Sequence, residues 1–339
     1  MYIKNLLRQS LFLLGGIAFF GCGTSNTTTE SKPLTIAFGS CNRTDLPQVM
    51  WEPLVTNQPD VFVWLGDIVY GDTHDMRDLR AKYNRLASEP GYQQLGTISE
   101  IIGVWDDHDY GWNDAGKNYS KRDSSKQVLL DFLGTTTDAP IRNREGLYSS
   151  YEFGSHPTLT KVILLDTRYF RDTVIIDTTP GRRYTTNDTG DILGKEQWEW
   201  LFSELKNSDA DFHIIGSGIQ VIPEEHGWEK WANFPKSRKK LLDLMTELTP
   251  KNPLIISGDR HIAEYSKIKL KPGYELYEVT SSGLTHTWSN IWEEANKHRV
   301  DDMIVKKNFG VIEITPNRMT VEIRGELDSL FKSVEIPLN

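Results

Sequence analysis

The chain has 339 residues, of which 38% are hydrophobic and 25% charged, and 38 basic against 47 acidic residues give a formal net charge of −9. This composition supports a sizeable folded core and excludes an intrinsically disordered chain. The acidic surplus argues against a surface that binds nucleic-acid backbone, so we expect none. Only two cysteines are present, Cys22 and Cys41, which excludes a disulfide scaffold and a cysteine-rich zinc module.

The chain begins with the features of an export signal. Lys4 and Arg8 precede the apolar run Leu11–Phe20, which is shorter than the roughly 20 residues that span a bilayer. The Phe-Phe-Gly-Cys sequence that follows is similar to a bacterial lipobox with Cys22 as the lipidated residue. The alternative is an ordinary signal peptide with an incidental cysteine.

These features divide the chain into three parts. Residues 1–21 are predicted to be a lipoprotein signal peptide, and residues 22–33 a polar, Thr-rich flexible tether. Residues 34–339 form the predicted folded domain. We therefore expect an exported protein, lipid-anchored to a bacterial membrane and located in the periplasm or on the cell surface.

Apolar runs and helical patterns alternate over the next part of the chain. Strands are predicted at Leu34–Phe38, Val61–Leu65, Ile101–Trp105, Lys161–Leu165, Phe212–Ile215 and Leu254–Ile256. Helices are predicted at Pro47–Gln58, Asp75–Ala87, Gly194–Lys206 and Ser237–Thr249. Continuous apolar strands between helices favour a layered α/β core whose strands are buried on both faces.

After Glu264 the pattern changes to hairpin-like strands. They are predicted at Tyr274–Val279, Gly310–Ile314, Met319–Ile323 and Ser333–Ile336. Two longer irregular stretches, residues 170–192 and 222–236, are predicted to be loops around a site. The chain shows no internal repeat and no inner linker, which indicates one domain.

Polar residues follow several of the predicted strands. The groups are Gly39-Ser40-Cys41-Asn42, Gly66-Asp67, Asp106-Asp107-His108-Asp109, Asp166-Thr167-Arg168, Gly216-Ser217-Gly218 and Gly258-Asp259-Arg260-His261. Ligands bind at the carboxyl ends of strands in α/β sheets. Helix caps and turns would explain any one of these aspartates, but the whole set indicates a binding site.

Two residue types at these positions favour a transition metal. Tyr70 follows Asp67 in a D-x-x-Y pattern, and a tyrosinate ligand suggests ferric iron, since a phenol stays protonated beside weaker Lewis acids. Cys41 offers a thiolate, which also suits a transition metal. Asp259 and His261 are two residues apart, so extended backbone would point both side chains the same way.

The segment from Asp106 to Asp114 predicts a second kind of metal site. Its acids, Asp106, Asp107, Asp109 and Asp114, have no lysine or arginine nearby before Lys117. Carboxylates this close repel one another unless a cation lies among them, and with the oxygen of Asn113 they suit calcium or magnesium. The alternative is a solvated acidic loop. Arg168 and Arg171 are candidates for holding an oxyanion, or for surface ion pairs.

Five motifs in the same order resemble those of the PhoD-like alkaline phosphatases of the metallophosphatase superfamily. They are Gly39-Ser40-Cys41, Gly66-Asp67-Ile68-Val69-Tyr70, Trp105-Asp106-Asp107-His108-Asp109, Gly258-Asp259-Arg260-His261 and Thr280-Ser281-Ser282-Gly283-Leu284. The resemblance implies a four-layer α/β/β/α sandwich, one ferric ion with calcium ions beside it, and phosphoester hydrolysis. We expect the core to start at Leu34 without the small β domain of many members, and residues 309–339 to be strands without the family's C-terminal lid.

The resemblance also implies roles for individual residues. The iron ligands would be Cys41, Asp67, Tyr70, Asp259 and His261, with Asp67 bridging. The calcium side would use Asp106 or Asp107, together with Asn113. Candidates for holding the phosphate are Asn42, Arg168 and His286, with Arg168 also in the catalytic set.

The expected chemistry is metal-dependent hydrolysis of a small-molecule or lipid phosphoester by a metal-activated hydroxide, in a monomer. His108 is a candidate for protonating the leaving oxygen or for a supporting hydrogen bond. One alternative is a phosphodiesterase or phospholipase D-type activity at the same site. Another is a surface lipoprotein that binds glycans through its ten tryptophans.

Overall fold

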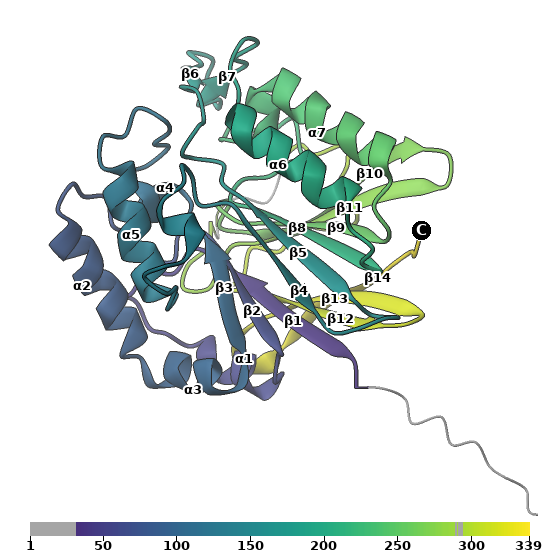
Figure 1. Cartoon of the computed structure of the whole chain (residues 1–339), viewed down its shortest axis with the longest axis horizontal. Helices are drawn as coiled ribbons and strands as arrows, with labels where there is room; N and C mark the ends of the chain where they lie inside the picture. Colours follow the sequence, from purple (N-terminus) through teal and green to yellow (C-terminus); the bar gives the residue numbers. More distant parts are fainter. Residues whose placement is uncertain (1–31, 289, 291–293) are drawn as a thin grey trace, which may run out of the picture. The chain divides into compact units, whose positions relative to one another are not determined.

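Two six-stranded β-sheets form the centre of the fold in a computed structural model, which describes residues 32–288, 290 and 294–339 (Figure 1). The predicted signal and Cys22 lie outside the described residues. Residues 33–339 make up one compact unit. Within the described residues, we find no helix with the length and apolar character needed to cross a membrane.

The first sheet has the strand order β14-β13-β12-β1-β2-β3. Its strands are β1 (Leu34–Gly39), β2 (Val61–Leu65), β3 (Glu100–Val104), β12 (Phe309–Thr315), β13 (Arg318–Arg324) and β14 (Leu330–Ile336). β1, β2 and β3 are parallel, whereas β12, β13 and β14 pair antiparallel.

The second sheet has the order β10-β11-β9-β8-β5-β4. Its strands are β4 (Ser149–Phe153), β5 (Thr160–Leu165), β8 (Phe212–Ser217), β9 (Pro253–Ser257), β10 (Ala263–Lys271) and β11 (Tyr274–Ser281). β5, β8, β9 and β11 run parallel to one another, so their carboxyl ends share one edge, whereas β4 and β10 pair antiparallel at the two sides of the sheet.

Helices cover the outer faces of the two sheets (Figure 1). On one side lie α1 (Trp51–Thr56), α2 (Met76–Ala87) and α3 (Pro90–Ile98), with α5 (Arg122–Phe132) packed on α2. On the other side lie α6 (Gly194–Lys206) and α7 (Pro235–Leu248). Short elements in the connections are α4 (Asp107–Tyr110), η1 (Pro140–Arg142), β6 (Ile175–Ile176), β7 (Tyr184–Thr185), η2 (Trp231–Asn233) and η3 (Glu326–Asp328).

The continuous apolar sequence of β5 shows why the layers form. Val162 and Leu164 join the core between the sheets, whereas Ile163 and Leu165 join a second core beneath α6 and α7. Because side chains alternate along a strand, burial on both faces requires apolar residues at every position. Each such side chain contributes roughly 1.5–3 kcal/mol on burial. The four-layer α/β/β/α sandwich expected from the sequence is confirmed.

Besides the short elements in the connections, four longer elements were not anticipated from the sequence: β4, β10, α3 and α5. β4 is an edge strand with half-buried polar positions, and β10 exposes or half-exposes lysines along its second half. Neither has the continuous apolar run of a central strand. The predicted helix at Pro47–Gln58 is also longer than α1, which spans Trp51–Thr56.

Candidate functional site

The loops that follow the parallel strands bring predicted ligands from distant parts of the chain together. Asp67 follows β2, and its Oδ2 lies 3.6 Å from Sγ of Cys41, which follows β1. The hydroxyl of Tyr70 donates to the same Oδ2 over 3.4 Å. It also lies 3.3 Å from Nε2 of His286, which follows β11 of the other sheet. The site is therefore built from both sheets.

The candidate ligands form two groups, and within each group the donor atoms all lie within 4.8 Å of one another. One consists of Asp67, Asp107 and His108, and the other of Asp106, Asp107 and Asp259. Asp107 belongs to both. Between the two neighbouring aspartates that the sequence left open, Asp107 is thus the one that faces both groups.

Several predicted ligands have left-handed backbone conformations. The φ angles are 61° for Cys41, 48° for Asp67, 67° for Asp259 and 52° for His261. For residues with a Cβ this conformation costs about 1–2 kcal/mol, and such strain gathers at functional sites. The expectation that extended backbone aligns Asp259 and His261 was therefore wrong, because tight turns orient these side chains.

Glycines let these loops approach closely around Asp106. A Cβ added to Gly66, whose φ is +83°, would lie 2.2 Å from Cβ of Asp106. A Cβ on Gly218 would lie 2.3 Å from Oδ1 of the same residue. Glycine at these two positions is required by space, and at Gly66 also by the backbone conformation.

The buried acids of the site are only partly satisfied by hydrogen bonds. Burial raises the pKa of Asp67, Asp106 and Asp259 well above the usual range. Asp106 Oδ2 and Asp107 Oδ1 have no hydrogen-bond partner among the described residues. Buried charges of this kind are usually paired or coordinate metals. The residues present therefore fit a cation.

Of the sulfur, phenol and imidazole ligands, Cys41 is buried and Tyr70 and His261 are half-buried. Burial raises the pKa of the Cys41 thiol and of the Tyr70 hydroxyl well above their usual values, and nearby carboxylates add to the effect. Burial lowers the pKa of His261 to about 3, so this imidazole is neutral, which is the form that ligates metals. Nδ1 of His261 has no hydrogen-bond partner within the part of the chain that is described.

His108 has the electrostatic surroundings of a proton donor. Burial opposes its charge, but Asp67, Asp107 and Asp72 raise its pKa to about 11. Its Nδ1 lies 2.8 Å from Oδ1 of Asp72, and its ring lies 4.2 Å from that of Tyr70. His108, itself a member of the first ligand group, is thus held at Nδ1 by Asp72 beside Asp67 and Asp107.

Arg168 and Asn42, both predicted to hold phosphate, are fully buried. Arg168 donates from Nε to Asp106 over 2.6 Å and from Nη1 to Glu229 over 2.7 Å. Asn42 donates from Nδ2 to the carbonyl of Ile68 over 3.1 Å. In this structure both side chains support the loops that carry the acids, and neither is exposed to a substrate.

Sequence reasoning missed Glu229. This residue is buried, and it pairs with both Arg168 and Arg171, the latter over 2.9 Å. The pairing also accounts for Arg171, which the sequence left as an oxyanion clamp or a surface ion pair. The available signal was only its place in the predicted site loop at residues 222–236.

The other residues of the acidic segment have hydrogen-bond or ion-pair partners of their own. Asp109 accepts from the backbone N–H groups of Ile68 and Asp106, over 3.1 and 2.7 Å. Asp114 pairs with Arg183 over 2.7 Å, and Asn113 is exposed with its amide donating to Asp114. The argument that these charges lack basic partners was wrong, since it counted only neighbours in sequence.

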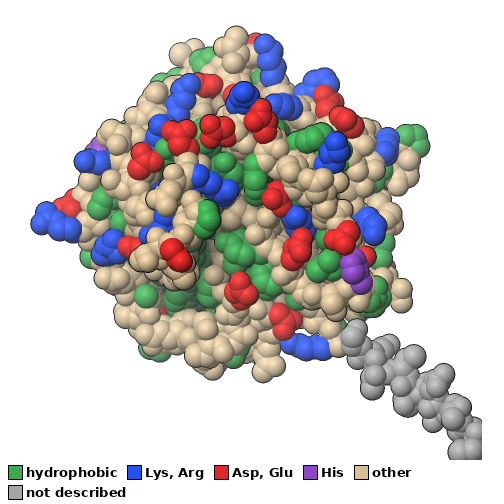
Figure 2. All heavy atoms as spheres, viewed as in Figure 1, with side chains coloured by type: hydrophobic (Ala, Val, Ile, Leu, Met, Phe, Trp, Pro, Cys, Tyr) green, Lys and Arg blue, Asp and Glu red, His purple; other side chains and the backbone are tan. Residues whose placement is uncertain are grey.

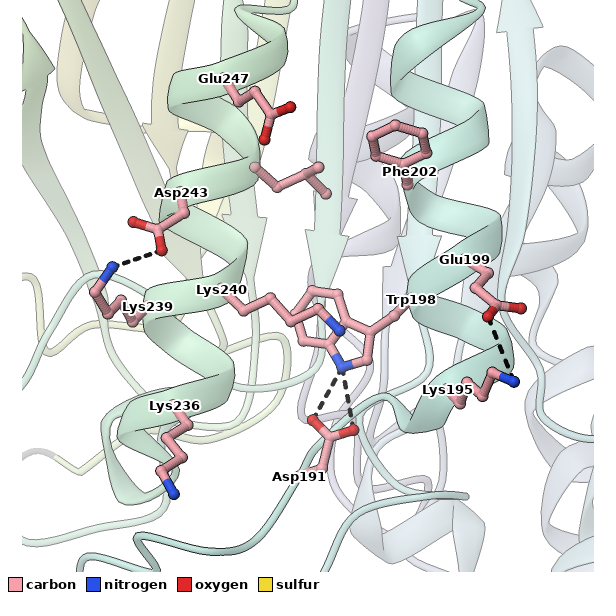
Figure 3. Close-up of a pocket in the computed structure, with 11 residues that line it drawn as sticks. Asp191, Lys195, Trp198, Glu199, Phe202, Lys236, Lys239, Lys240, Asp243 and Glu247 are labelled. Carbon is pink, nitrogen blue, oxygen red and sulfur yellow. Dashed lines mark hydrogen bonds and ion pairs between the residues drawn. The ribbon is translucent and has the colours of Figure 1, made fainter.

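A hollow of about 740 Å³ lies between α6 and α7, apart from the predicted site residues (Figure 3). Its walls carry both charges, and Nε1 of Trp198 donates to Asp191 at its base. Among the described residues, none of the predicted site residues lines it. We therefore place the functional site at the strand ends.

Comparisons with known proteins agree with this fold. A family model described as PhoD-like phosphatase matches residues 36–321. The chain is 23% identical over 322 residues to a protein named alkaline phosphatase D from Bacillus subtilis (strain 168), covering 81% of this chain and 54% of that protein. The chain thus spans about half the length of this curated relative.

Three solved structures are similar over most of the chain. A structure titled PhoD has a TM-score of 0.72 at 16% identity, covering 90% of this chain and 68% of that one. A dimetal phosphatase from Danio rerio has a TM-score of 0.56 at 14% identity, covering 91% and 100%. A structure titled GAP50, the anchor in the inner membrane complex of Plasmodium, has a TM-score of 0.59 at 12% identity, covering 91% of this chain and 90% of that one. These likenesses show the fold.

Proposed function

Because the chain belongs to the PhoD-like phosphatase family, we propose that it hydrolyses phosphate esters with the help of metal ions held at the strand ends. The observation that carries the proposal is the position of Asp107. Its carboxylate belongs to both ligand groups, and one oxygen has no hydrogen-bond partner among the described residues. An acid in this position suits two adjacent cations.

The ligand types divide the proposed site into two sides. Cys41, Tyr70 and His261, with Asp67 and Asp259, offer the sulfur, phenolate, nitrogen and oxygen donors that suit ferric iron. Asp107 and Asp106, with the exposed amide of Asn113, offer only oxygen donors, which suit calcium. Bound ions would supply an activated water and offset the negative charge of the phosphoryl oxygens.

The chain's own residues have distinct tasks in this reaction. His108, protonated and held at Nδ1 by Asp72, is the proposed donor of a proton to the leaving oxygen. His286 is half-buried beside Tyr70 and is the proposed phosphate contact. Arg168 positions Asp106 and acts on the substrate only through it.

Iron at this site has a spectroscopic test. A tyrosinate bound to ferric iron should give the purified protein a visible absorption band, and Tyr70→Phe should remove it and lower activity. Tyr274→Phe is the control, because Tyr274 is buried at the start of β11 and its hydroxyl donates to the carbonyl of Pro250, away from the strand ends that carry the site. A colourless protein with full activity would overturn the assignment of iron.

Two classes of phosphoester are candidate substrates. Phosphate monoesters are the first candidate, and phosphodiesters, including lipid headgroups, are the second because the proposed lipid anchor would place the site beside a membrane. A paired assay with a monoester and the corresponding diester separates them. The rate ratio assigns the class, whereas no hydrolysis of either substrate by metal-loaded protein would contradict the proposed function.

The glycan-binding alternative has little support in the structure. Trp51, Trp64, Trp105, Trp198 and Trp231 are buried in the two cores and cannot form a surface platform. On the face drawn in Figure 2, basic and acidic side chains are interspersed. The GAP50 likeness shows that the fold also occurs in a protein titled an anchor, so the proposal depends on the ligand set.

For cellular location, we propose export and attachment to a membrane through lipid on Cys22, with the protein a monomer. The support is the charged, apolar and Phe-Gly-Cys pattern of residues 1–22. The membrane contact would be the anchor alone, and the partner a small-molecule or lipid phosphoester.

A further inference from the structure

Two tryptophans stand beside the proposed metal centre. The backbone N–H of Trp288 donates to the carbonyl of His261 over 3.0 Å, and the two rings lie 5.6 Å apart. The ring of Trp228 stacks on that of Trp288, with centroids 5.9 Å apart and planes 19° from parallel. Trp288 remains 44% exposed, so the pair offers an aromatic face to solvent next to a proposed metal ligand.

Trp228 also lines a hollow of about 410 Å³. Ile176, Arg182 and Arg183 also line it, and Ile176 is 75% exposed. The volume lies within the roughly 300–1,000 Å³ typical of small-molecule sites. The lining combines the indole of Trp228 and an apolar side chain with charges of both signs, since Asp177 lines it together with the two arginines.

A second chain of contacts joins this hollow to the proposed site. Arg183 pairs with Asp114 over 2.7 Å, and the backbone N–H of Asp114 donates to the carboxylate of Asp107. Two series of residue contacts therefore link the lining of the hollow to the ligand groups. One runs through Trp228, Trp288 and His261, and the other through Arg183 and Asp114.

The backbone holds this wall in place. The carbonyl of Gly227 accepts from the N–H groups of Arg183 and Tyr184, over 2.8 and 3.3 Å. A Cβ added to Gly227 would lie 2.4 Å from the carbonyl oxygen of Gly181. The loop that carries Trp228 thus packs tightly on the segment that carries the two arginines.

We propose that Trp228 and Trp288 form a specificity subsite for phosphoesters whose leaving group carries a planar aromatic ring. The proposal rests on the proposed phosphoester hydrolysis. Stacking on an indole rewards a flat ring and not a puckered one.

The test compares phenyl phosphate with cyclohexyl phosphate in the metal-loaded full-length protein. Loss of a stacking side chain weakens ring binding about tenfold or more. Trp288→Ala should therefore raise KM for phenyl phosphate about tenfold, while KM for cyclohexyl phosphate changes less than about twofold. Trp288→Phe should restore most of the difference. Trp200→Ala is the matched control, because Trp200 lies on α6 and packs there against Tyr148.

Binding gives a readout that does not require turnover. Wild-type protein should bind phenylphosphonate more tightly than methylphosphonate in calorimetry, and Trp288→Ala should abolish the difference. Equal loss of both substrates in Trp288→Ala, or equal binding of the two phosphonates by wild type, would overturn the subsite while leaving phosphoester hydrolysis intact. If wild type hydrolyses neither these two monoesters nor the corresponding diesters, the proposed function fails, and the phosphonate comparison still decides whether the aromatic subsite exists.

Discussion

Arg168 donates a hydrogen bond from Nε to Oδ1 of Asp106 over 2.6 Å, and neither side chain exposes any surface. The contact joins the loop after β5 to the loop after β3, across the two sheets. The other carboxylate oxygen of Asp106, Oδ2, has no hydrogen-bond partner among the described residues. One oxygen of Asp106 is thus fixed by the protein, while the other is left for a ligand.

Removing Arg168 should destabilise the fold strongly. Arg168→Met leaves Asp106 buried without its closest partner and Glu229 with Arg171 alone, and breaking a buried pair in this way costs about 3–5 kcal/mol. Urea unfolding of the purified variant measures the change. Arg80→Met is the control, since Arg80 and Asp131 form an exposed pair that should contribute less than about 1 kcal/mol. Equal stability losses in the two variants would contradict this account.

Asp107 should control metal content. Asp107→Asn keeps the shape of the side chain but removes the charge shared by both ligand groups. We expect a loss of bound metal by elemental analysis and a fall in activity of at least about a hundredfold, since even outer residues of metal sites cost 10–100-fold. Asp243→Asn on α7, which only pairs with Lys239 on the surface, should retain both. Full metal content in Asp107→Asn would refute the shared role.

Glu278 should make stability depend on pH. It is buried on β11 and accepts from the backbone N–H of Val221, and burial raises its pKa to about 7. Between about pH 4.5 and 7 the native state holds this proton more strongly than the unfolded state, so stability is greatest below this window and falls as pH rises through it.

The matching variant is Glu278→Gln, which has no proton to lose. Relative to wild type, it should gain stability between pH 5 and pH 8, by at most about 3 kcal/mol. Urea unfolding at the two pH values measures this difference. Glu275→Gln is the control, because Glu275 lies on the same strand and is partly exposed beside Lys267. Parallel pH dependence of Glu278→Gln and wild type would show that Glu278 does not titrate in this window.

Cys22 should decide where the protein is found. Cys22→Ser removes the proposed site of lipidation, so the variant should leave the membrane fraction while its soluble activity is unchanged. Fractionation followed by an activity assay measures both. Cys41→Ser is the contrasting variant, because it should stay with membranes and lose metal. A Cys22→Ser protein that still sediments with membranes would refute the anchor.

The layered core was predictable because apolar runs such as Val61–Leu65 show burial on both faces of a strand. The positions of Asp67 and Asp107 were predictable because parallel strands end at a common edge. The conformation at Asp259 was not predictable, since left-handed turns leave no apolar pattern. The pairing of Arg168 with Glu229 joins residues 61 positions apart in sequence, and local charge counting does not detect such pairs.

The most direct test of the central claim is the rate of phosphate release from phenyl phosphate by the purified protein, measured with its metals, after chelation and after metals are restored. We expect hydrolysis by the metal-loaded protein, its loss on chelation and its recovery when iron and calcium are returned. A full rate after chelation, with metals shown to be absent, would contradict the account, as would no hydrolysis of this or any other phosphoester by the fully loaded protein.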